Sequence, residues 1–158
     1  PRGKLLKLST GAEGGGKYYN SDKERIRFIN SFGEDFLVSY PKTEWKLLNE
    51  TKQIGNYLCY KALSVESVKT RNGGYKKYII EAWYTPEINV RFGPIGFSGL
   101  PGLILELTRG KIKYFAAQIN LGLKQKTQIN KPKSGLKVTS EKYNELAIEA
   151  MGGYRKMR

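Results

Sequence analysis

The sequence contains no histidine and a single cysteine, Cys59. The missing imidazole excludes histidine-based acid–base catalysis and most zinc sites, because both depend on that side chain. One thiol cannot form a disulfide within the chain. We therefore expect no metal and no cofactor, and we expect Cys59 to be a small buried core residue. Two alternatives for it are a weak nucleophile and a thiol that pairs with a cysteine of an exported partner.

Long apolar runs and acidic residues are also scarce. No stretch reaches the roughly 18 apolar residues of a membrane-spanning helix, so we expect no transmembrane segment. The chain has 28 Lys and Arg against 14 Asp and Glu, a formal net charge of +14. Nucleic acids and anionic lipids both attract such charge. No helix-turn-helix, zinc-finger or RNA-binding motif accompanies it, and the basic segments lack interleaved stacking aromatics, so we expect no nucleic-acid partner.

Short β-rich runs separated by Gly, Asn, Ser and Pro make up most of the chain. Such runs predict strands at 4–10, 25–30 and 35–41. Runs at 57–70 and 75–85 flank an Asn-Gly pair, the strongest local hairpin signal. A second hairpin is predicted from 103–108 and 112–121. Period-two alternation places four residues on one strand face: Tyr78, Ile80, Ala82 and Tyr84.

The C-terminal part differs from the rest. Thr139 or Ser140 can cap a helix over 139–151, with Glu141 in its first turn. Its apolar stripe consists of Tyr143, Leu146, Ala147, Ala150 and Met151. We expect one α+β domain over 1–158, a predominantly antiparallel β-sheet (a curved sheet or a partly open barrel) with this one C-terminal helix.

The Gly-rich stretch at 11–18, "GAEGGGKY", nearly fits a phosphate-binding loop. Tyr18 stands where that loop needs Ser or Thr for magnesium. The residues that follow are turn-rich and β-leaning, so no helix N-terminus is expected to face a phosphate. We interpret the stretch as a flexible loop.

The middle of the chain is almost uncharged. Between Ala82 and Thr108 the only charged residues are Glu87, Arg91 and Glu106. Pro and Gly at 101 and 102 predict a type II turn that leads into a core strand at 103–107. Structural turns account for each glycine of this region: Gly93, Gly96, Gly99 and Gly102.

A second interpretation of the same region is a site that binds a partner or ligand. Its candidate residues are Trp83, Tyr84, Pro86, Glu87, Arg91, Phe92, Pro94, Phe97, Leu100 and Pro101. We expect Glu87 and Arg91 to form an ion pair with each other, since isolated charges in apolar surroundings are usually paired. Hydrolysis by a carboxylate pair would need Glu81, Glu87 or Glu106 to converge. No catalytic residue is assigned.

Three blocks of the chain resemble the GLPGLI family of Bacteroidota. They are "WKLLNETKQIGNYLCYKA", "AWYTPEINVRFGPIGFSGLPGLILEL" with the signature motif, and "INKPKSGLKVTSEKYNEL". The resemblance covers roughly residues 28–150. It implies an exported envelope protein made with a signal peptide, often encoded beside TonB-dependent outer-membrane transporters. Members are typically longer, so we expect an N-terminal segment ahead of Pro1 and a variable part over 1–27.

The expected function is that of a non-enzymatic cell-envelope protein, an accessory subunit or partner of an outer-membrane complex. The alternative is a periplasmic or surface module that binds a peptide, lipid or glycan in an apolar pocket near Trp83, Tyr84 and Phe92. A hydrolase is the third possibility.

Overall fold

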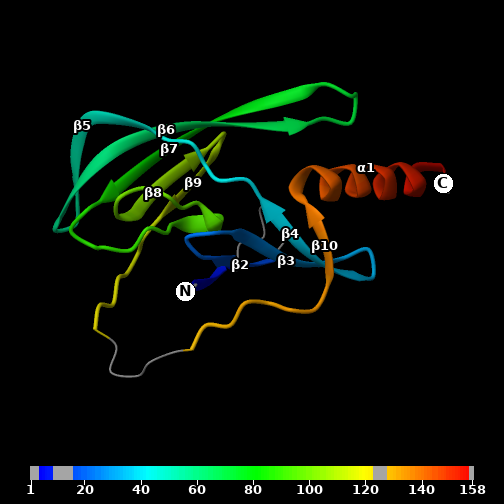
Figure 1. The fold of residues 1–158 in the computed structure, drawn as a ribbon. Helices are drawn as coiled ribbons and strands as arrows, with labels where there is room; N and C mark the ends of the chain where they lie inside the picture. The colour runs from blue at the N-terminus through cyan, green and yellow to red at the C-terminus, as the bar shows by residue number, and fades with distance from the viewer. Residues whose placement is uncertain (1–3, 9–15, 123–127, 157–158) are drawn as a thin grey trace.

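The computed structural model describes residues 4–8, 16–122 and 128–156, which form two open five-stranded sheets and one C-terminal helix (Figure 1). Nearly all strand pairs are antiparallel. The α+β class with a predominantly antiparallel sheet and one C-terminal helix is therefore confirmed. Two separate open sheets take the place of a single curved sheet or a barrel. No helix within the described ranges is long and apolar enough to cross a membrane.

The first sheet has the order β1-β2-β3-β4-β10. Its strands are β1 (Lys4–Leu8), β2 (Gly16–Asn20), β3 (Arg25–Ser31), β4 (Glu34–Tyr40) and β10 (Leu136–Thr139). The last of these runs parallel to β4, with Leu136 opposite Phe36. This pairing brings the C-terminal part of the chain back onto the N-terminal sheet.

The second sheet has the order β5-β6-β7-β8-β9 and is antiparallel throughout. Its strands are β5 (Lys46–Ile54), β6 (Tyr57–Lys69), β7 (Tyr75–Thr85), β8 (Leu103–Arg109) and β9 (Ile112–Phe115). Both hairpins expected from turn chemistry, β6–β7 and β8–β9, are confirmed. β7 lies at the centre of the sheet.

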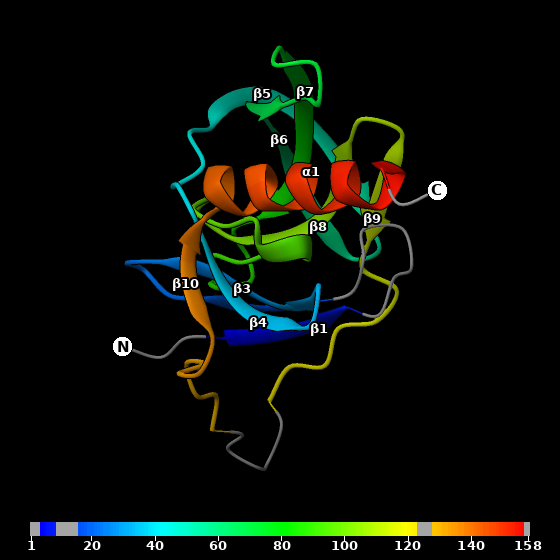
Figure 2. The same cartoon turned by 90° about the vertical axis from the view of Figure 1, so that its right-hand side faces the viewer.

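The main core lies where the two sheets face each other (Figure 2). Ile80, Ala82 and Tyr84 of β7 point into it, as the period-two pattern predicted, and Tyr18 of β2 meets them from the first sheet. Residues from the β7–β8 connection and from β8 complete it: Ile95, Phe97, Leu100, Ile104 and Leu107. Burial of this apolar surface is the main force that holds the sheets together.

The helix α1 (Ser140–Lys156) packs beside this core, against β4, β10 and β6. Thr139 Oγ1 accepts a hydrogen bond from the Lys142 N–H at 3.1 Å, as expected of an N-cap. Tyr143 and Leu146 of the predicted stripe pack on the first sheet. Met151 does not, and it is 48% exposed. The C-terminal end of α1 extends beyond the sheets (Figure 1), and there the Met151 sulfur lies 2.7 Å from Arg71 Nη2.

Four sequence expectations need correction. Residues 16–18 of the Gly-rich stretch belong to the strand β2 instead of a loop, while 9–15 lie outside the described residues. Residues 136–139, where no strand was predicted, form β10. The strand expected over 112–121 ends at Phe115, and the helix expected to end at 151 continues to Lys156. Pairing with β3 and β4 explains β2 and β10, since tertiary contacts override weak local propensity. The helix continues past Gly152 and Gly153 because glycine lowers the stability of a helix without necessarily ending it.

Candidate functional site

Residues 86–102 connect β7 to β8, and we call them the Pro-Gly corner. A short 3₁₀ turn, η1 (Pro94–Gly96), lies inside it. Backbone hydrogen bonds tie the corner to the start of β8: Leu103 N–H donates to Ile88 O at 3.2 Å, and Ile104 N–H donates to Phe92 O at 3.0 Å. The corner is thus an ordered extension of the second sheet although it contains no regular strand.

Side chains of other elements hold the corner from both sheets. Asn20 of β2 donates to Gly96 O at 3.0 Å, and Arg25 of β3 donates to Ile95 O at 3.0 Å. Trp45 donates its indole N–H to Ser98 O at 2.8 Å. Ile95 has φ 46°, a left-handed conformation that is costly for a β-branched residue. These donors, aimed at successive carbonyls, hold the backbone in that conformation.

The turn at Pro101 and Gly102 is not of type II. Gly102 N–H donates to Leu100 O at 2.8 Å, which closes a three-residue γ-turn, and the Leu103 N–H is taken by Ile88. Glycine is required at 102 for a different reason from the one expected. A Cβ there would overlap the carbonyl of Thr85 and lie 2.9 Å from the Cα of Pro86. The motif glycine therefore allows the turn to pack directly on the end of β7.

The predicted site residues divide into a buried and an exposed set. Tyr84, Phe97 and Leu100 belong to the core between the sheets, and Trp83 is buried on the opposite face of β7. Phe92 and Pro94 are half-buried. The exposed set is Pro86, Glu87, Arg91 and Pro101. The predicted turn glycines Gly93, Gly96 and Gly102 are buried and Gly99 is exposed. The structure thus does not bring the predicted set together at one surface.

The expected ion pair between Glu87 and Arg91 is not formed. Glu87 Oε1 instead accepts a hydrogen bond from the backbone N–H of Leu58, at 3.1 Å. Within the described part of the chain, no ion pair joins Glu87 to Arg91. The carboxylate links the corner to the start of β6, and Leu58 beside it is 41% exposed.

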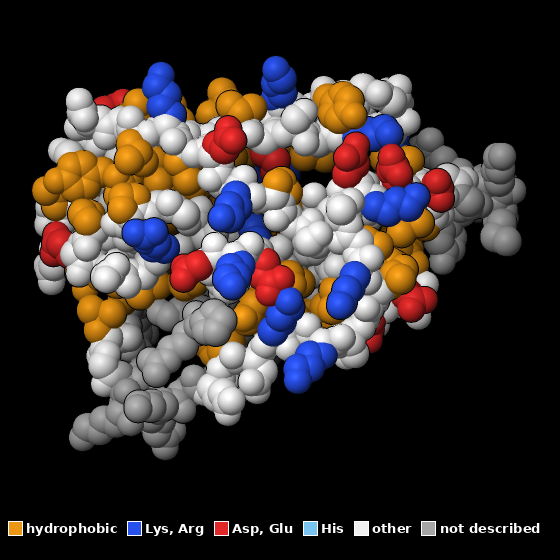
Figure 3. Space-filling view, viewed as in Figure 1, with side chains coloured by type: hydrophobic (Ala, Val, Ile, Leu, Met, Phe, Trp, Pro, Cys, Tyr) orange, Lys and Arg blue, Asp and Glu red, His pale blue; other side chains and the backbone are white. Residues whose placement is uncertain are grey.

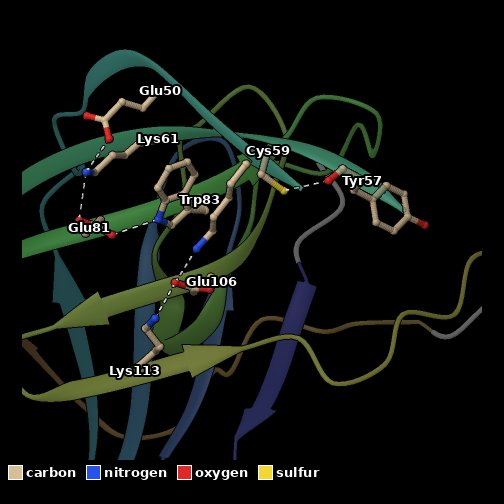
Figure 4. Close-up of polar contacts among 9 residues, drawn as sticks. Glu50, Tyr57, Cys59, Lys61, Glu81, Trp83, Glu106 and Lys113 are labelled. Carbon is tan, nitrogen blue, oxygen red and sulfur yellow. Dashed lines mark hydrogen bonds and ion pairs between the residues drawn. The ribbon is translucent and has the colours of Figure 1, made fainter. Parts of the chain in front are cut away.

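Trp83 lies beneath a network of charged side chains (Figure 4). Its indole N–H donates to Glu81 Oε1 at 3.0 Å. Lys52 Nζ lies 4.4 Å from the ring centroid and Lys61 Nζ lies 5.6 Å from it, both within cation–π range. Lys61 also pairs with Glu50 at 3.1 Å and with Glu81 at 3.4 Å. The ring is 8% exposed because these lysines and the apolar cluster around Cys59 and Leu105 together cover it.

Glu106 is the most buried carboxylate of this network. Lys52 and Lys113 both place Nζ 2.9 Å from its Oε1. Desolvation alone would raise the pKa of Glu106, but the hydrogen bonds from Lys113 and Lys52 outweigh it and lower the pKa below its ordinary value. A carboxyl group that acts as a general acid needs a raised pKa, which is the opposite of the shift at Glu106. Glu106 is therefore arranged as an ionised partner of two lysines, Glu81 pairs with Lys61, and Glu87 bonds a backbone N–H.

Cys59 lies under the same network and is fully buried, which confirms its expected place in the core. It packs with Trp83 and Leu105. Burial raises the pKa of the Cys59 thiol, and the nearby Lys52 opposes that shift. The raised pKa and full burial both disfavour a reactive thiolate. Among the described residues, no group of three or more potential ligands could hold a metal ion.

A larger feature lies between the sheets and α1, and the sequence did not reveal it. It is a cleft of about 870 Å³, which we call the interlayer cleft. Its charged and aromatic lining includes Arg25 and Arg27 of β3, Tyr40, Glu66 of β6, Phe97, Arg109 of β8 and Tyr143 of α1. The surface is hollowed between the β6–β7 hairpin and α1 (Figure 3).

Of the predicted site residues, only Phe97 lines this cleft. The apolar pocket expected near Trp83, Tyr84 and Phe92 is occupied by packing, since Tyr84 lies in the core and Trp83 lies under lysines. A second groove, of about 630 Å³, lies on the other face of the first sheet beside Lys131 and Lys137. The one sequence signal for the cleft is the alternation of Arg25 and Arg27, which places both side chains on the same face of a strand.

Comparison with known proteins adds one match. Residues 45–75 and 73–106 are similar to the model of a family described as a protein of unknown function (Porph_ging). No curated protein and no solved structure matches the chain. The matched residues extend from the start of β5 into β8, so they include the whole Pro-Gly corner and the network around Trp83 except for Lys113.

Proposed function

We propose that this chain is a non-enzymatic interaction protein of the bacterial cell envelope, an accessory subunit of an outer-membrane complex of the TonB-dependent transporter type. The proposal includes membership of the GLPGLI family, export, and a docking surface at the Pro-Gly corner. The resemblance of the motif blocks to that family supports the location. The geometry of the corner supports the docking surface.

The main support for the docking surface is a set of exposed side chains on the rigid backbone of the Pro-Gly corner. Gly102 packs on the backbone of Thr85 and Pro86, which brings the exposed Pro101 to the same corner as the exposed Pro86. The hydrogen bond from Leu58 N–H to Glu87 places Leu58 beside them. Figure 3 shows hydrophobic side chains gathered at this end of the second sheet, where β5 turns into β6. We call Leu58, Pro86, Glu87 and Pro101 the corner patch.

The corner patch suits a protein partner because its support does not have to rearrange on binding. Rigid surfaces lose less conformational entropy in a complex than mobile loops do. Exposed apolar side chains grouped on such a surface are typical of protein–protein contacts. The ion-paired state of Glu81 and Glu106 fits a structural role for the charged network better than hydrolysis.

Co-fractionation of the full-length protein with outer membranes of its native host tests this proposal. We expect Leu58→Glu to release the protein from a high-mass membrane complex, because a carboxylate would be desolvated at the contact. Leu136→Glu is the matched control, since Leu136 is 51% exposed and lies on the first sheet. Retention of Leu58→Glu in the complex, or recovery of the wild-type protein only as a free monomer, would contradict the proposal.

A further inference from the structure

We propose that the interlayer cleft binds a small organic anion through the guanidinium groups of Arg25 and Arg27, with the apolar body of the ligand against the aromatic rings beside them. The ligand has a carboxylate or a phosphate group, which arginine recognises in the same bidentate way. This site is separate from the corner patch, so it does not depend on the proposed docking function.

The size of the cleft fits a small molecule. Its volume of about 870 Å³ lies within the roughly 300–1,000 Å³ range of typical ligand pockets. Its walls come from strands and the first turns of α1, and the helix is fixed there by Asn144, which donates to Lys69 O at 2.8 Å. Tyr143 further ties the helix to the first sheet through a 3.0 Å hydrogen bond between its hydroxyl and Ser31 Oγ. The cavity is therefore largely formed before a ligand enters.

The charge of the lining favours an anion. Five basic residues line the cleft against three acidic ones, Glu44, Glu66 and Glu141. Glu66 pairs with Arg109, whose Nε lies 2.7 Å from Glu66 Oε2, and Lys69 pairs with Glu145 at 3.1 Å. Arg25, Arg27 and Lys42 then supply the positive excess of the lining over Glu44 and Glu141. The cleft has low-dielectric walls, which concentrate the field of the basic residues that remain.

The direct partners of the Arg25 guanidinium are two aromatic rings and a backbone carbonyl. The guanidinium stacks between the rings of Tyr40 and Phe97, 4.5 Å from each centroid, and it donates to one backbone carbonyl, that of Ile95. None of the ion pairs among the described residues involves Arg25. Burial lowers the pKa of Arg25, with Tyr40 and Glu66 acting in the opposite direction. An anion bound in the cleft would pair with the Arg25 guanidinium and offset the free-energy cost of burying its charge.

Aromatic rings around the arginines supply the apolar part of the site. Tyr40 and Phe97 flank Arg25, and the Tyr143 ring packs edge-on to Phe36 at 5.3 Å. Phe97 is only 2% exposed, so a ligand with a flat apolar body would lie against the half-buried rings of Tyr40 and Tyr143 while its charged end reaches Arg25 and Arg27. Inorganic phosphate lacks such a body and would bind more weakly.

The test is a titration of the purified protein with phenyl phosphate, benzoate and inorganic phosphate, followed by calorimetry and by the NMR signals of arginine Nε–H groups. We expect saturable 1:1 binding of phenyl phosphate or benzoate, tighter than that of inorganic phosphate, with shifts at the cleft arginines. The tighter of the two organic probes identifies the preferred charged group. We expect Arg27→Gln to weaken binding about 10-fold, because one charge-assisted interaction is lost.

A second variant keeps the test decisive if Arg27→Gln folds poorly. Glu66→Gln removes a negative charge from the lining of the cleft, so it should tighten the binding of an anion severalfold. Lys137→Gln is the control, because Lys137 lines the groove on the opposite face of the first sheet. The proposal is overturned if the organic anions do not saturate, if Glu66→Gln fails to tighten binding, or if Lys137→Gln weakens it as much as Arg27→Gln.

Discussion

The two faces of β7 bury neighbouring aromatic residues by different means. Tyr84 is 6% exposed and Trp83 is 8% exposed, so their burial is almost equal. Tyr84 is covered by a second sheet and by Ile95, Phe97 and Leu100 of the corner. Trp83 is covered by lysine side chains that are held in place by glutamates. One face is thus covered by apolar packing, and the other combines apolar packing around Cys59 and Leu105 with a cover of ion-paired lysines.

Because the two side chains are covered differently, we expect their contributions to the free energy of unfolding to differ in salt dependence although their burial is almost equal. Apolar packing resists salt, whereas ion pairs at a partly exposed surface weaken as counterions screen them. The lysine cover also leaves the Trp83 face with a charged exterior, and the buried Tyr84 face joins the two sheets. The following substitutions separate the two kinds of stabilisation.

The largest effect is expected for Tyr84→Ala. Truncation of an aromatic side chain in a packed core costs about 3–5 kcal/mol of unfolding free energy. The loss should be the same in 0.05 M and 1 M NaCl, as measured by urea unfolding. A loss below about 1.5 kcal/mol, or one that changes strongly with salt, would show that the sheets are not held together by this core.

A smaller effect is expected for Glu106→Gln. The substitution leaves Lys52 and Lys113 without their shared carboxylate, and hydrogen bonds to charged groups contribute about 1.5–3 kcal/mol each at most. Because the lysines can turn to solvent, we expect a net loss of about 1–2 kcal/mol that shrinks at 1 M NaCl. Glu149→Gln on the exposed part of α1 is the control and should change little. An equal loss at both salt concentrations would mean that Glu106 stabilises the protein through packing and not through its charge.

The same carboxylate gives a pH dependence with a definite sign. The pKa of Glu106 is lowered in the folded protein from an ordinary value of 4.5. Its contribution to stability is therefore fully present above that value and is lost as the pH falls through the lowered folded pKa. Urea unfolding between pH 7 and pH 3 should show a smaller decline for Glu106→Gln than for the wild type, whereas Tyr84→Ala should follow the wild-type slope. Parallel curves for all three proteins would contradict the assignment.

The smallest effect is expected for Cys59→Ala, about 1 kcal/mol, since it removes one buried sulfur beneath Trp83. The loss should not depend on salt, because Cys59 contributes packing and no charge. Urea unfolding at the two salt concentrations is again the measurement. A salt-dependent loss would mean that the lysine network had been disturbed.

Local signals explain which parts of the fold were predictable from the sequence. The Asn72-Gly73 pair specifies the β6–β7 hairpin through its own turn geometry, and Thr139 caps α1 through its own side chain. β10 was missed because Leu136–Thr139 is only four residues long and its partner β4 lies far away in the sequence. The γ-turn was missed because the hydrogen bond that excludes a type II turn comes from Ile88, outside the turn itself.

The candidate sites follow the same rule. The corner is one continuous segment, so its turns and its exposed prolines were recognisable, but the partner of Glu87 is the backbone of Leu58, 29 residues away. The interlayer cleft was not recognisable because its arginines come from β3 and β8 and its tyrosines from β4 and α1. Only the folded topology brings these residues together.

Site-specific photo-crosslinking in outer membranes of the native host tests the docking function most directly. A photoreactive amino acid at Leu58 or Pro101 would sample the corner patch, and one at Leu136 would sample an equally exposed position on the first sheet. We predict that the first two positions crosslink to one and the same outer-membrane protein and that Leu136 does not. Crosslinks to that protein from Leu136 alone, or none from either corner position, would contradict the account.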